Sequence, residues 1–88
     1  MVTKVVQILN RAGIHARPAA LIVQAIKNFK SSIYFKKDDT QINAKSIMGI
    51  LMLGASYGSE IEMTAEGEDE QQAIDTLTRV FESKFEEE

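Results

Sequence analysis

The chain has 88 residues, a formal net charge of −3, one histidine and no cysteine. This length suffices for a single domain, which we expect to span residues 1–88. Without cysteine there are no disulfide bonds, and we expect neither a metal site nor a cofactor. The acidic balance argues against nucleic-acid binding. No apolar run is long enough to span a bilayer and no signal-peptide pattern is present, so we expect a cytoplasmic protein without membrane insertion.

Residues 2–9 are rich in β-branched side chains and alternate roughly between apolar and polar types. This pattern predicts a strand with Val6 and Ile8 on one face. Residues 10–13 (NRAG) follow and are typical of a loop. The chain therefore begins with a strand that leads, through one loop, to its single histidine.

The next segment predicts a helix over residues 16–27. Its apolar residues at helical spacing are Ala16, Ala19, Ala20, Val23 and Ile26. Pro18 fits only in the first turn, where a missing backbone N–H costs nothing. Because the residue before a proline resists the α conformation, Arg17 is expected at the helix start. His15 is then expected just before the helix or at its N-cap.

A β-hairpin is predicted after this helix. Residues 32–37 (SIYFKK) alternate, with Ile33 and Phe35 facing inward. Residues 38–39 are both aspartate and are typical of a tight turn. We expect this turn to lead to a short third strand over residues 40–43.

A short apolar helix is predicted over residues 47–53, with Ser46 as its N-cap and Gly54 at its end. A helix that lies on a sheet buries one stripe, for which Ile50 and Leu53 have the right spacing. The remaining apolar side chains include Ile47, Met48 and Leu51. The pattern leaves two interpretations open, a helix buried on more than one side or a helix with an exposed docking patch.

Residues 60–65 predict a fourth strand, and Gly67 and Asp69 precede a final helix. The apolar stripe of that helix consists of Ala73, Ile74, Leu77, Val80, Phe81 and Phe85. The predicted order is βαββαβα. We therefore expect an α+β fold, a two-layer open-faced sandwich with three helices on one face of a four-stranded antiparallel sheet.

His15 and Arg17 are the candidate catalytic residues. The first N–H groups of a helix have no partner within it and coincide with the positive end of the helix dipole. A neutral imidazole at this place has a nucleophilic ring nitrogen. A phosphoryl group on that nitrogen would meet the same N–H groups and the guanidinium of Arg17. A histidine that only caps the helix or lies on the surface is the alternative.

Residues 13–19 (GIHARPA) resemble the active-site motif of the HPr family, the histidine-containing phosphocarrier proteins of the bacterial phosphoenolpyruvate-dependent sugar phosphotransferase system. Residues 45–49 (KSIMG) resemble the regulatory serine motif of the same family. The spacing of the two motifs and the predicted order of elements are similar to this family over essentially the whole chain. The resemblance implies an HPr-like fold.

The resemblance implies a phosphoryl carrier and not an enzyme with its own substrate turnover. Enzyme I, phosphorylated by phosphoenolpyruvate, would pass its phosphoryl group to Nδ1 of His15, and phospho-His15 would pass it to enzyme IIA proteins for sugar uptake. Arg17 would stabilise the phosphoryl group in transfer. The family's docking face corresponds here to Ala20, Gln24, Ile47, Met48 and Leu51. We expect the carrier to be a monomer.

The resemblance also implies that an HPr kinase/phosphorylase phosphorylates Ser46. The implied results are slower phosphorylation of His15 by enzyme I and, in some bacteria, binding to a catabolite-control repressor. From the residues alone Ser46 is a helix cap, and the two roles are compatible because the charge of a phosphoserine is favoured by the dipole at a helix N-terminus.

Three other functions are alternatives to a phosphoryl carrier. A regulatory phosphoprotein of the same fold, in a relay without sugar transport, is the second choice, and the presence of both His15 and Ser46 favours the full carrier. An RNA-binding sheet needs exposed aromatic side chains and a basic surface, whereas Tyr34 is the one outward aromatic expected in the strands. A hydrolase with His15 as its base lacks a neighbouring acidic residue and a cysteine nucleophile.

Overall fold

The structure of the chain is a computed structural model that describes residues 1–86. Its elements are β1 (Val2–Gln7), α1 (Ala16–Ile26), β2 (Ser32–Lys37), β3 (Thr40–Asn43), α2 (Ile47–Met52), β4 (Glu60–Glu66), α3 (Glu70–Glu82) and the 3-10 turn η1 (Lys84–Glu86). The predicted order βαββαβα is confirmed. The expected single domain also includes residues 87 and 88, which lie outside the described residues.

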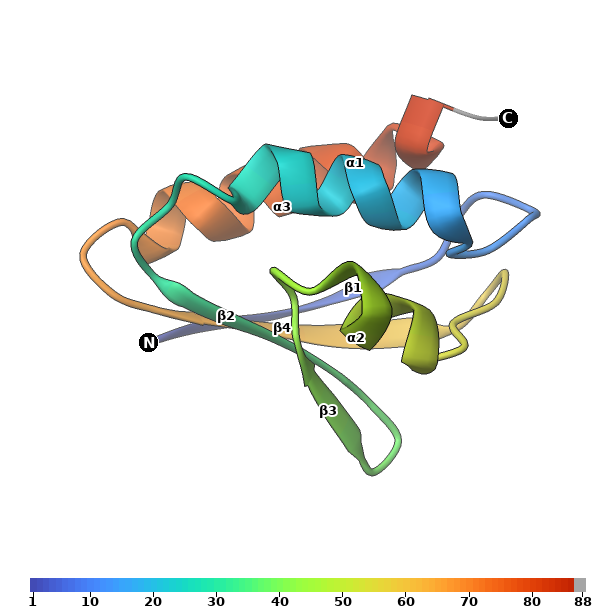
Figure 1. The fold of residues 1–88 in the computed structure, drawn as a ribbon, viewed down its shortest axis with the longest axis horizontal. Coiled ribbons are helices and arrows are strands. Elements are labelled where there is room, and N and C mark those ends of the chain that lie inside the picture. Colours follow the sequence, from blue (N-terminus) through green and yellow to red (C-terminus); the bar gives the residue numbers. More distant parts are fainter. Residues whose placement is uncertain (87–88) are drawn as a thin grey trace.

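The strands form one antiparallel sheet in the order β1-β4-β2-β3, so β1 and β3 are its edges (Figure 1). The register aligns inward side chains across the sheet, with Val6 opposite Ile61 and Phe35 opposite Met63. These four side chains are at most 9% exposed. Because alternate side chains of a strand point to opposite faces, the predicted alternation puts one whole face of the sheet into the core.

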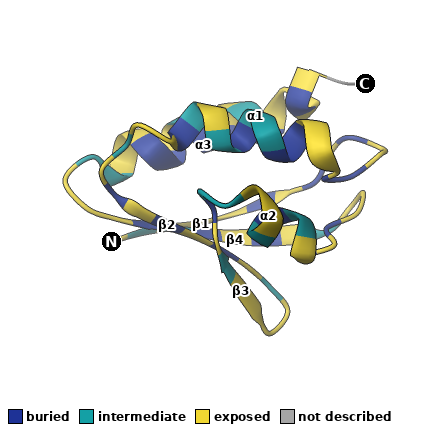
Figure 2. Cartoon of the chain, in the orientation of Figure 1, coloured by how far each residue is buried: buried dark blue, intermediate teal, exposed yellow. Residues whose placement is uncertain are grey.

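The helices cover this inward face and leave the other face of the sheet open (Figure 1). α1 packs against α3, α3 also packs on β1 and β4, and α2 contacts α1 and β3. Figure 2 shows the buried residues concentrated where the helices and the sheet face each other. Phe81 of α3 contacts Phe35 and Phe85 edge to face, with ring centroids 5.9 and 5.0 Å apart. The predicted open-faced α+β sandwich is confirmed.

The buried stripe of α1 differs from the predicted one. Its buried residues are Pro18, Ala19, Ile22 and Ile26. The prediction omitted Ile22 and included Ala16, which is exposed. Several alanines in the segment fit more than one helical face. The long side chain of Ile22, three residues after Ala19 and four before Ile26, determines which face is buried.

Two predicted ends differ from the structure by more than one residue. β1 ends at Gln7 and not at residue 9, although the Ile8 N–H still donates a hydrogen bond of 2.8 Å to the Ser59 carbonyl. α3 ends at Glu82, so the last residue of its predicted stripe, Phe85, lies in η1 with a φ of 55°. Phe85 is nevertheless fully buried. The hydrophobic pattern thus predicted the burial of this residue but not the helix end that precedes it.

The start of α3 is tied to the connection between α1 and β2. Asp69, the N-cap residue, accepts hydrogen bonds from the backbone N–H groups of Lys30 and Ser31 at 2.8 and 2.9 Å, and from the Ser31 hydroxyl. Ser31 is fully buried. The Ser31 hydroxyl, and then the Lys30 N–H, lower the pKa of Asp69 because they stabilise its charged form. An ionised carboxylate therefore holds these segments together.

Candidate functional site

His15 stands at the N-cap of α1, as predicted, and is exposed. Its backbone is extended, with φ −106° and ψ −165°. Its carbonyl accepts the N–H of Ala19 at 3.0 Å, which closes the first turn of the helix. Pro18 has no N–H, so the first-turn donors that point away from the helix are those of Ala16 and Arg17. The imidazole thus lies beside the positive end of α1.

Arg17 is the second residue of α1 and is exposed. It lies in the same helical turn as His15, at the same end of the molecule. A guanidinium at this place adds a full positive charge, with five N–H donors, to the partial charge of the helix end. The two residues therefore form an exposed, electropositive helix start that suits an anion such as a phosphoryl group.

The loop before His15 rests on the loop that precedes β4. The Ile14 N–H donates to the Ala55 carbonyl at 3.0 Å, and Ile14 is buried. The Asn10 side chain donates to the Gly13 carbonyl at 2.7 Å. Figure 1 shows the start of α1 and the loop before β4 at the same end of the molecule. His15 is therefore presented by a loop with fixed contacts.

Ser46 is the N-cap of α2, and this prediction is confirmed. Its Oγ accepts the Gly49 N–H at 3.0 Å. Gly49 lies close to β3, because an added Cβ would be 3.3 Å from the Asn43 carbonyl oxygen. The neighbouring Lys45 donates from Nζ to the Phe29 carbonyl at 2.6 Å, which links the start of α2 to the segment after α1.

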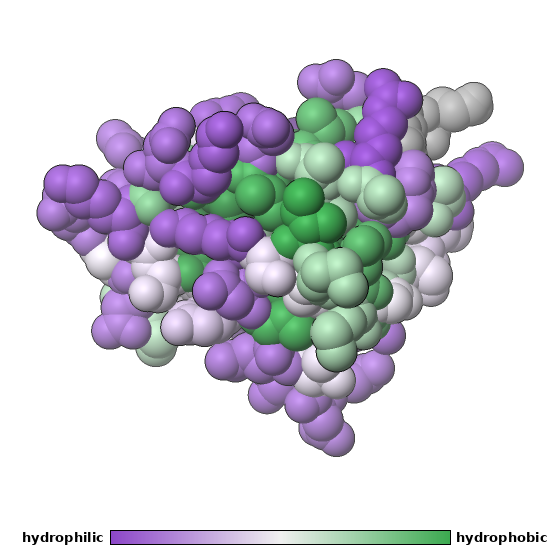
Figure 3. Space-filling view, in the orientation of Figure 1, coloured by the Kyte–Doolittle hydropathy of each residue, from purple (hydrophilic) through white to green (hydrophobic). Residues whose placement is uncertain are grey.

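The apolar helix α2 is exposed on one side. Ile50 is fully buried and Leu53 is 6% exposed, as the spacing predicted. Four other side chains form what we name the α2 patch: Ile47, Met48, Leu51 and Met52. Leu51 is half-buried, whereas Met48 and Met52 are 69% and 74% exposed. Figure 3 shows that apolar surface continues from α2 toward α1. Sequence reasoning missed Met52, the most exposed member of the patch.

Ala20 and Gln24, the candidate residues on α1, differ in their surroundings. Ala20 is half-buried and Gln24 is exposed. Gln24 lines a shallow hollow between α1 and the end of α3, together with Leu21 and Val80. Gln24 therefore borders this hollow while its side chain remains exposed to solvent.

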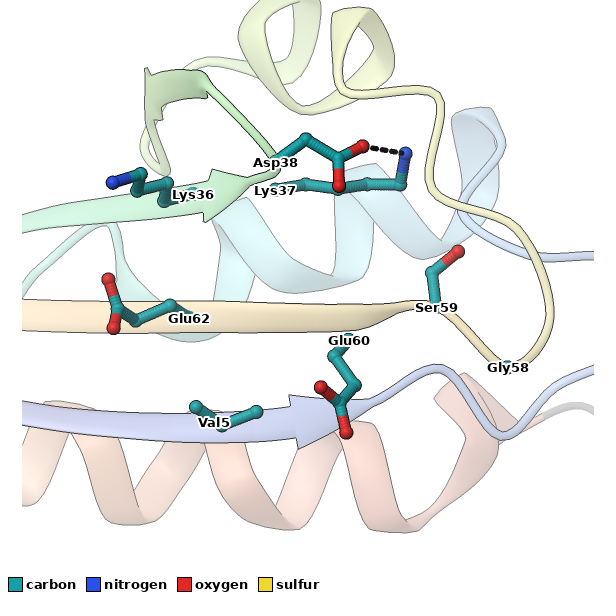
Figure 4. Close-up of a pocket in the computed structure, with 8 residues that line it drawn as sticks. All are labelled: Val5, Lys36, Lys37, Asp38, Gly58, Ser59, Glu60 and Glu62. Carbon is teal, nitrogen blue, oxygen red and sulfur yellow. Dashed lines mark hydrogen bonds and ion pairs between the residues drawn. The ribbon is translucent and has the colours of Figure 1, made fainter.

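A larger hollow, of about 710 Å³, lies on the open face of the sheet (Figure 4). Glu62 lies between Val5 of β1 and Lys36 of β2 in the strand register, and Glu60 also lines the hollow. None of the candidate residues line it. Tyr34 is 37% exposed, but the hollow has three carboxylates (Asp38, Glu60 and Glu62) against two lysines (Lys36 and Lys37). This negative balance would repel nucleic-acid phosphates, which disfavours RNA binding here.

Two further properties concern the described part of the chain. Among residues 1–86 no helix is long and apolar enough to cross a membrane. Within the same range no three histidine, cysteine, aspartate or glutamate side chains lie together in a way that could hold a metal ion.

A family model described as the "PTS HPr component phosphorylation site" matches residues 2–83. Together with the open-faced fold and the exposed histidine at a helix start, this match defines a phosphocarrier protein of the phosphotransferase system. The chain is 54% identical to the phosphocarrier protein HPr of Treponema pallidum, over the full length of both chains. It belongs to the HPr family.

Other relatives agree with this assignment. The crystal structure of HPr from Thermoanaerobacter tengcongensis superposes with a TM-score of 0.96 at 50% identity and covers 100% of this chain and 99% of its own. The HPr-like protein Crh of Bacillus subtilis is 46% identical over 77 residues, which cover 88% of this chain and 91% of Crh. The family therefore includes both carriers named HPr and HPr-like proteins of another name.

Proposed function

We propose that His15 accepts a phosphoryl group from phospho-enzyme I and passes it to enzyme IIA proteins for sugar uptake and phosphorylation. The observation that carries this proposal is the exposed imidazole at the N-cap of α1, with Arg17 in the same turn. In the first transfer, Nδ1 of His15 forms a P–N bond while the bond between phosphorus and enzyme I breaks. The second transfer repeats this exchange with an enzyme IIA protein as acceptor.

The helix start lowers the free energy of the phosphorylated carrier and of the transfer transition state. The N–H groups of Ala16 and Arg17 and the dipole of α1 stabilise negative charge beside His15. The Arg17 guanidinium binds phosphoryl oxygens while they carry charge between two proteins. Each partner supplies the second reacting group, so the chain turns over no small substrate alone.

The α2 patch and the exposed face of α1 serve as the docking surface on this proposal. It comprises Ala20, Gln24, Ile47, Met48 and Leu51, to which the exposure of Met52 adds a sixth residue. Clustered exposed apolar side chains are typical of partner surfaces, and methionines adapt to differently shaped partners. A small surface of this kind suits contacts that form and dissociate in every transfer cycle. We expect the carrier itself to be a monomer.

We propose Ser46 as the regulatory phosphorylation position, with HPr kinase/phosphorylase as the enzyme that modifies it. A phosphate there stands at the start of α2, where its charge is compatible with the helix. It also lies next to Ile47 and Met48, the exposed apolar residues that begin the docking surface. A Ser46→Asp variant should therefore slow phosphorylation of His15 while the fold is retained. Phospho-Ser46 is also the form that a catabolite-control repressor would bind.

The test is incubation with enzyme I, magnesium and phosphoenolpyruvate, followed by intact-mass analysis in base and in acid. We expect a gain of one phosphate that is stable in base and lost in acid, which locates it on the single histidine of the chain. His15→Ala should abolish the gain, and any acid-labile phosphate retained in that variant contradicts the assignment. No gain in the native chain with an active, matched enzyme I would favour the alternative, a regulatory phosphoprotein that acts through Ser46.

A further inference from the structure

Asn10 is a buried polar residue in the loop between β1 and His15. It is 0% exposed, whereas its neighbours Leu9 and Arg11 are exposed. Its Nδ2 donates a hydrogen bond of 2.7 Å to the Gly13 carbonyl. The Gly13 N–H in turn donates to the Asn10 backbone carbonyl at 3.1 Å. The side chain and backbone of Asn10 thus close the same four-residue turn together.

The peptide group between Gly13 and Ile14 is held at both of its polar atoms. Its carbonyl accepts from Asn10, and its N–H donates to the Ala55 carbonyl at 3.0 Å. Because a peptide group is planar, these two bonds fix its rotation about the chain. Gly13 has a φ of +72°, and an added Cβ would lie 2.8 Å from the Ala55 oxygen. The loop at Gly13 is therefore in close contact with Asn10 on one side and with Ala55 on the other.

His15 follows this fixed peptide group after one residue. On its other side, its carbonyl is bonded to the Ala19 N–H at 3.0 Å, so α1 fixes the backbone there. The direction in which the imidazole leaves the chain is set by these two attachments. Transfer of a phosphoryl group between two proteins depends on alignment of the attacking nitrogen with the phosphorus, and a misplacement of about 1 Å lowers such rates by up to 100-fold.

We propose that Asn10 is a positioning residue for phosphoryl transfer, which orients His15 through the Gly13–Ile14 peptide group. Asn10 does not touch the phosphoryl group, since it is fully buried. This inference rests on the proposed function of His15. It predicts that loss of the Asn10 amide lowers the rate of the transfer step itself, and not the affinity for the partner.

The test is single-turnover transfer from excess phospho-enzyme I at a series of enzyme I concentrations, with intact mass in base as the readout. Two variants remove the amide donor: Asn10→Ala, and Asn10→Asp, which keeps the shape. The control is Thr78→Val, because it also removes a buried hydrogen bond, from the Thr78 hydroxyl to the Ile74 carbonyl at 2.8 Å, but one within α3 and not at the Gly13–Ile14 peptide group. Circular dichroism and melting establish the temperature at which all variants are folded.

We expect the transfer rate at saturating enzyme I to fall about ten-fold in both Asn10 variants, with the half-saturating concentration changed by less than about two-fold. Thr78→Val should keep the native transfer rate. The inference is overturned if a folded Asn10 variant keeps the native transfer rate, or if Thr78→Val loses as much of that rate as the Asn10 variants. It is also overturned if neither Asn10 variant folds at any temperature. Absence of phosphate on the native chain would instead refute the proposed function.

Discussion

A pair of substitutions on α2 separates docking from stability. Met48 is 69% exposed and Ile50, two residues further on, is fully buried. Complete burial of a methionine side chain contributes about 1.5–3 kcal/mol, so the covered part of Met48 accounts for less than about 1 kcal/mol. Met48 is the second residue of α2, where a negative charge is favoured by the helix dipole. Met48→Glu should therefore leave the fold almost unchanged.

Ile50→Ala is the opposite case. Truncation of a fully buried isoleucine leaves a cavity in the core and costs about 2–5 kcal/mol. In a domain of this size each kcal/mol lowers the melting temperature by about 4–8 °C. The expected decrease for Ile50→Ala is therefore about 8–40 °C, against less than about 8 °C for Met48→Glu.

Docking should respond in the reverse order. A glutamate in the centre of an apolar contact is desolvated without a partner, so the Kd of Met48→Glu for enzyme I should rise about ten-fold or more. Ile50→Ala, measured well below its melting temperature, should bind within about three-fold of the native chain. Differential scanning calorimetry and isothermal titration calorimetry provide both numbers. A large fall in melting temperature for Met48→Glu, or native affinity in that variant, would refute the reasoning.

Three further predictions concern Asp69, Ser46 and Gly13. The pKa of Asp69 is lowered from 3.8 in the folded state, so its carboxylate stabilises the fold above that pH, and this contribution is lost as the pH falls through the lower folded-state value. The free energy of unfolding in urea should therefore depend less on acid pH in Asp69→Asn than in the native chain. An equal dependence in the two proteins would contradict this. Ser46→Ala should lower the free energy of unfolding by about 1 kcal/mol, because the Gly49 N–H loses its acceptor, whereas Ser46→Asp should keep the helix cap. Equal free energies of unfolding of the two variants in urea would refute the capping role of Ser46. Gly13→Ala should destabilise the fold more than Gly54→Ala. Both glycines have a positive φ, but of the two only Gly13 has other atoms within 4 Å of an added Cβ. Equal melting temperatures of the two variants would exclude the close contact at Gly13.

Much of the fold followed from the sequence, because the strongest patterns are also the ones that burial enforces. The strands alternate, and their inward residues, such as Phe35 and Met63, are buried as predicted. Pro18 restricted the helix start to a narrow window, which put His15 at the N-cap. Ser46 was recognisable as a cap from its residue type and from the apolar run that follows. These signals are local, so a single sequence contains them.

The rest depended on contacts between distant segments. Asn10 is polar and lies in a loop, where no periodicity indicates burial, and its hydrogen bond to the Gly13 carbonyl is seen only in the folded loop. Met52 and Leu51 are both apolar, and on a helix as short as α2 the sequence does not determine which of them faces solvent. The end of α3 was also missed, because Phe85 continues the helical spacing while the backbone leaves the helix at Glu82. Tertiary packing decides each of these cases.

The positions of His15 and Ser46 explain how one phosphate could control another without a change of fold. Both residues are helix N-caps, so added negative charge is favoured locally at either place and neither helix should unfold. What differs is the surroundings. Ser46 adjoins Ile47 and Met48, which are 41% and 69% exposed, whereas His15 adjoins Ala16 and Arg17. A phosphate on Ser46 must lose water when an apolar partner covers Met48, which costs free energy. α2 has no charged side chain to offset this cost, and the neighbouring Lys45 has its Nζ on the Phe29 carbonyl at 2.6 Å. On the proposed function, Ser46 therefore acts on docking, and His15 keeps its intrinsic reactivity.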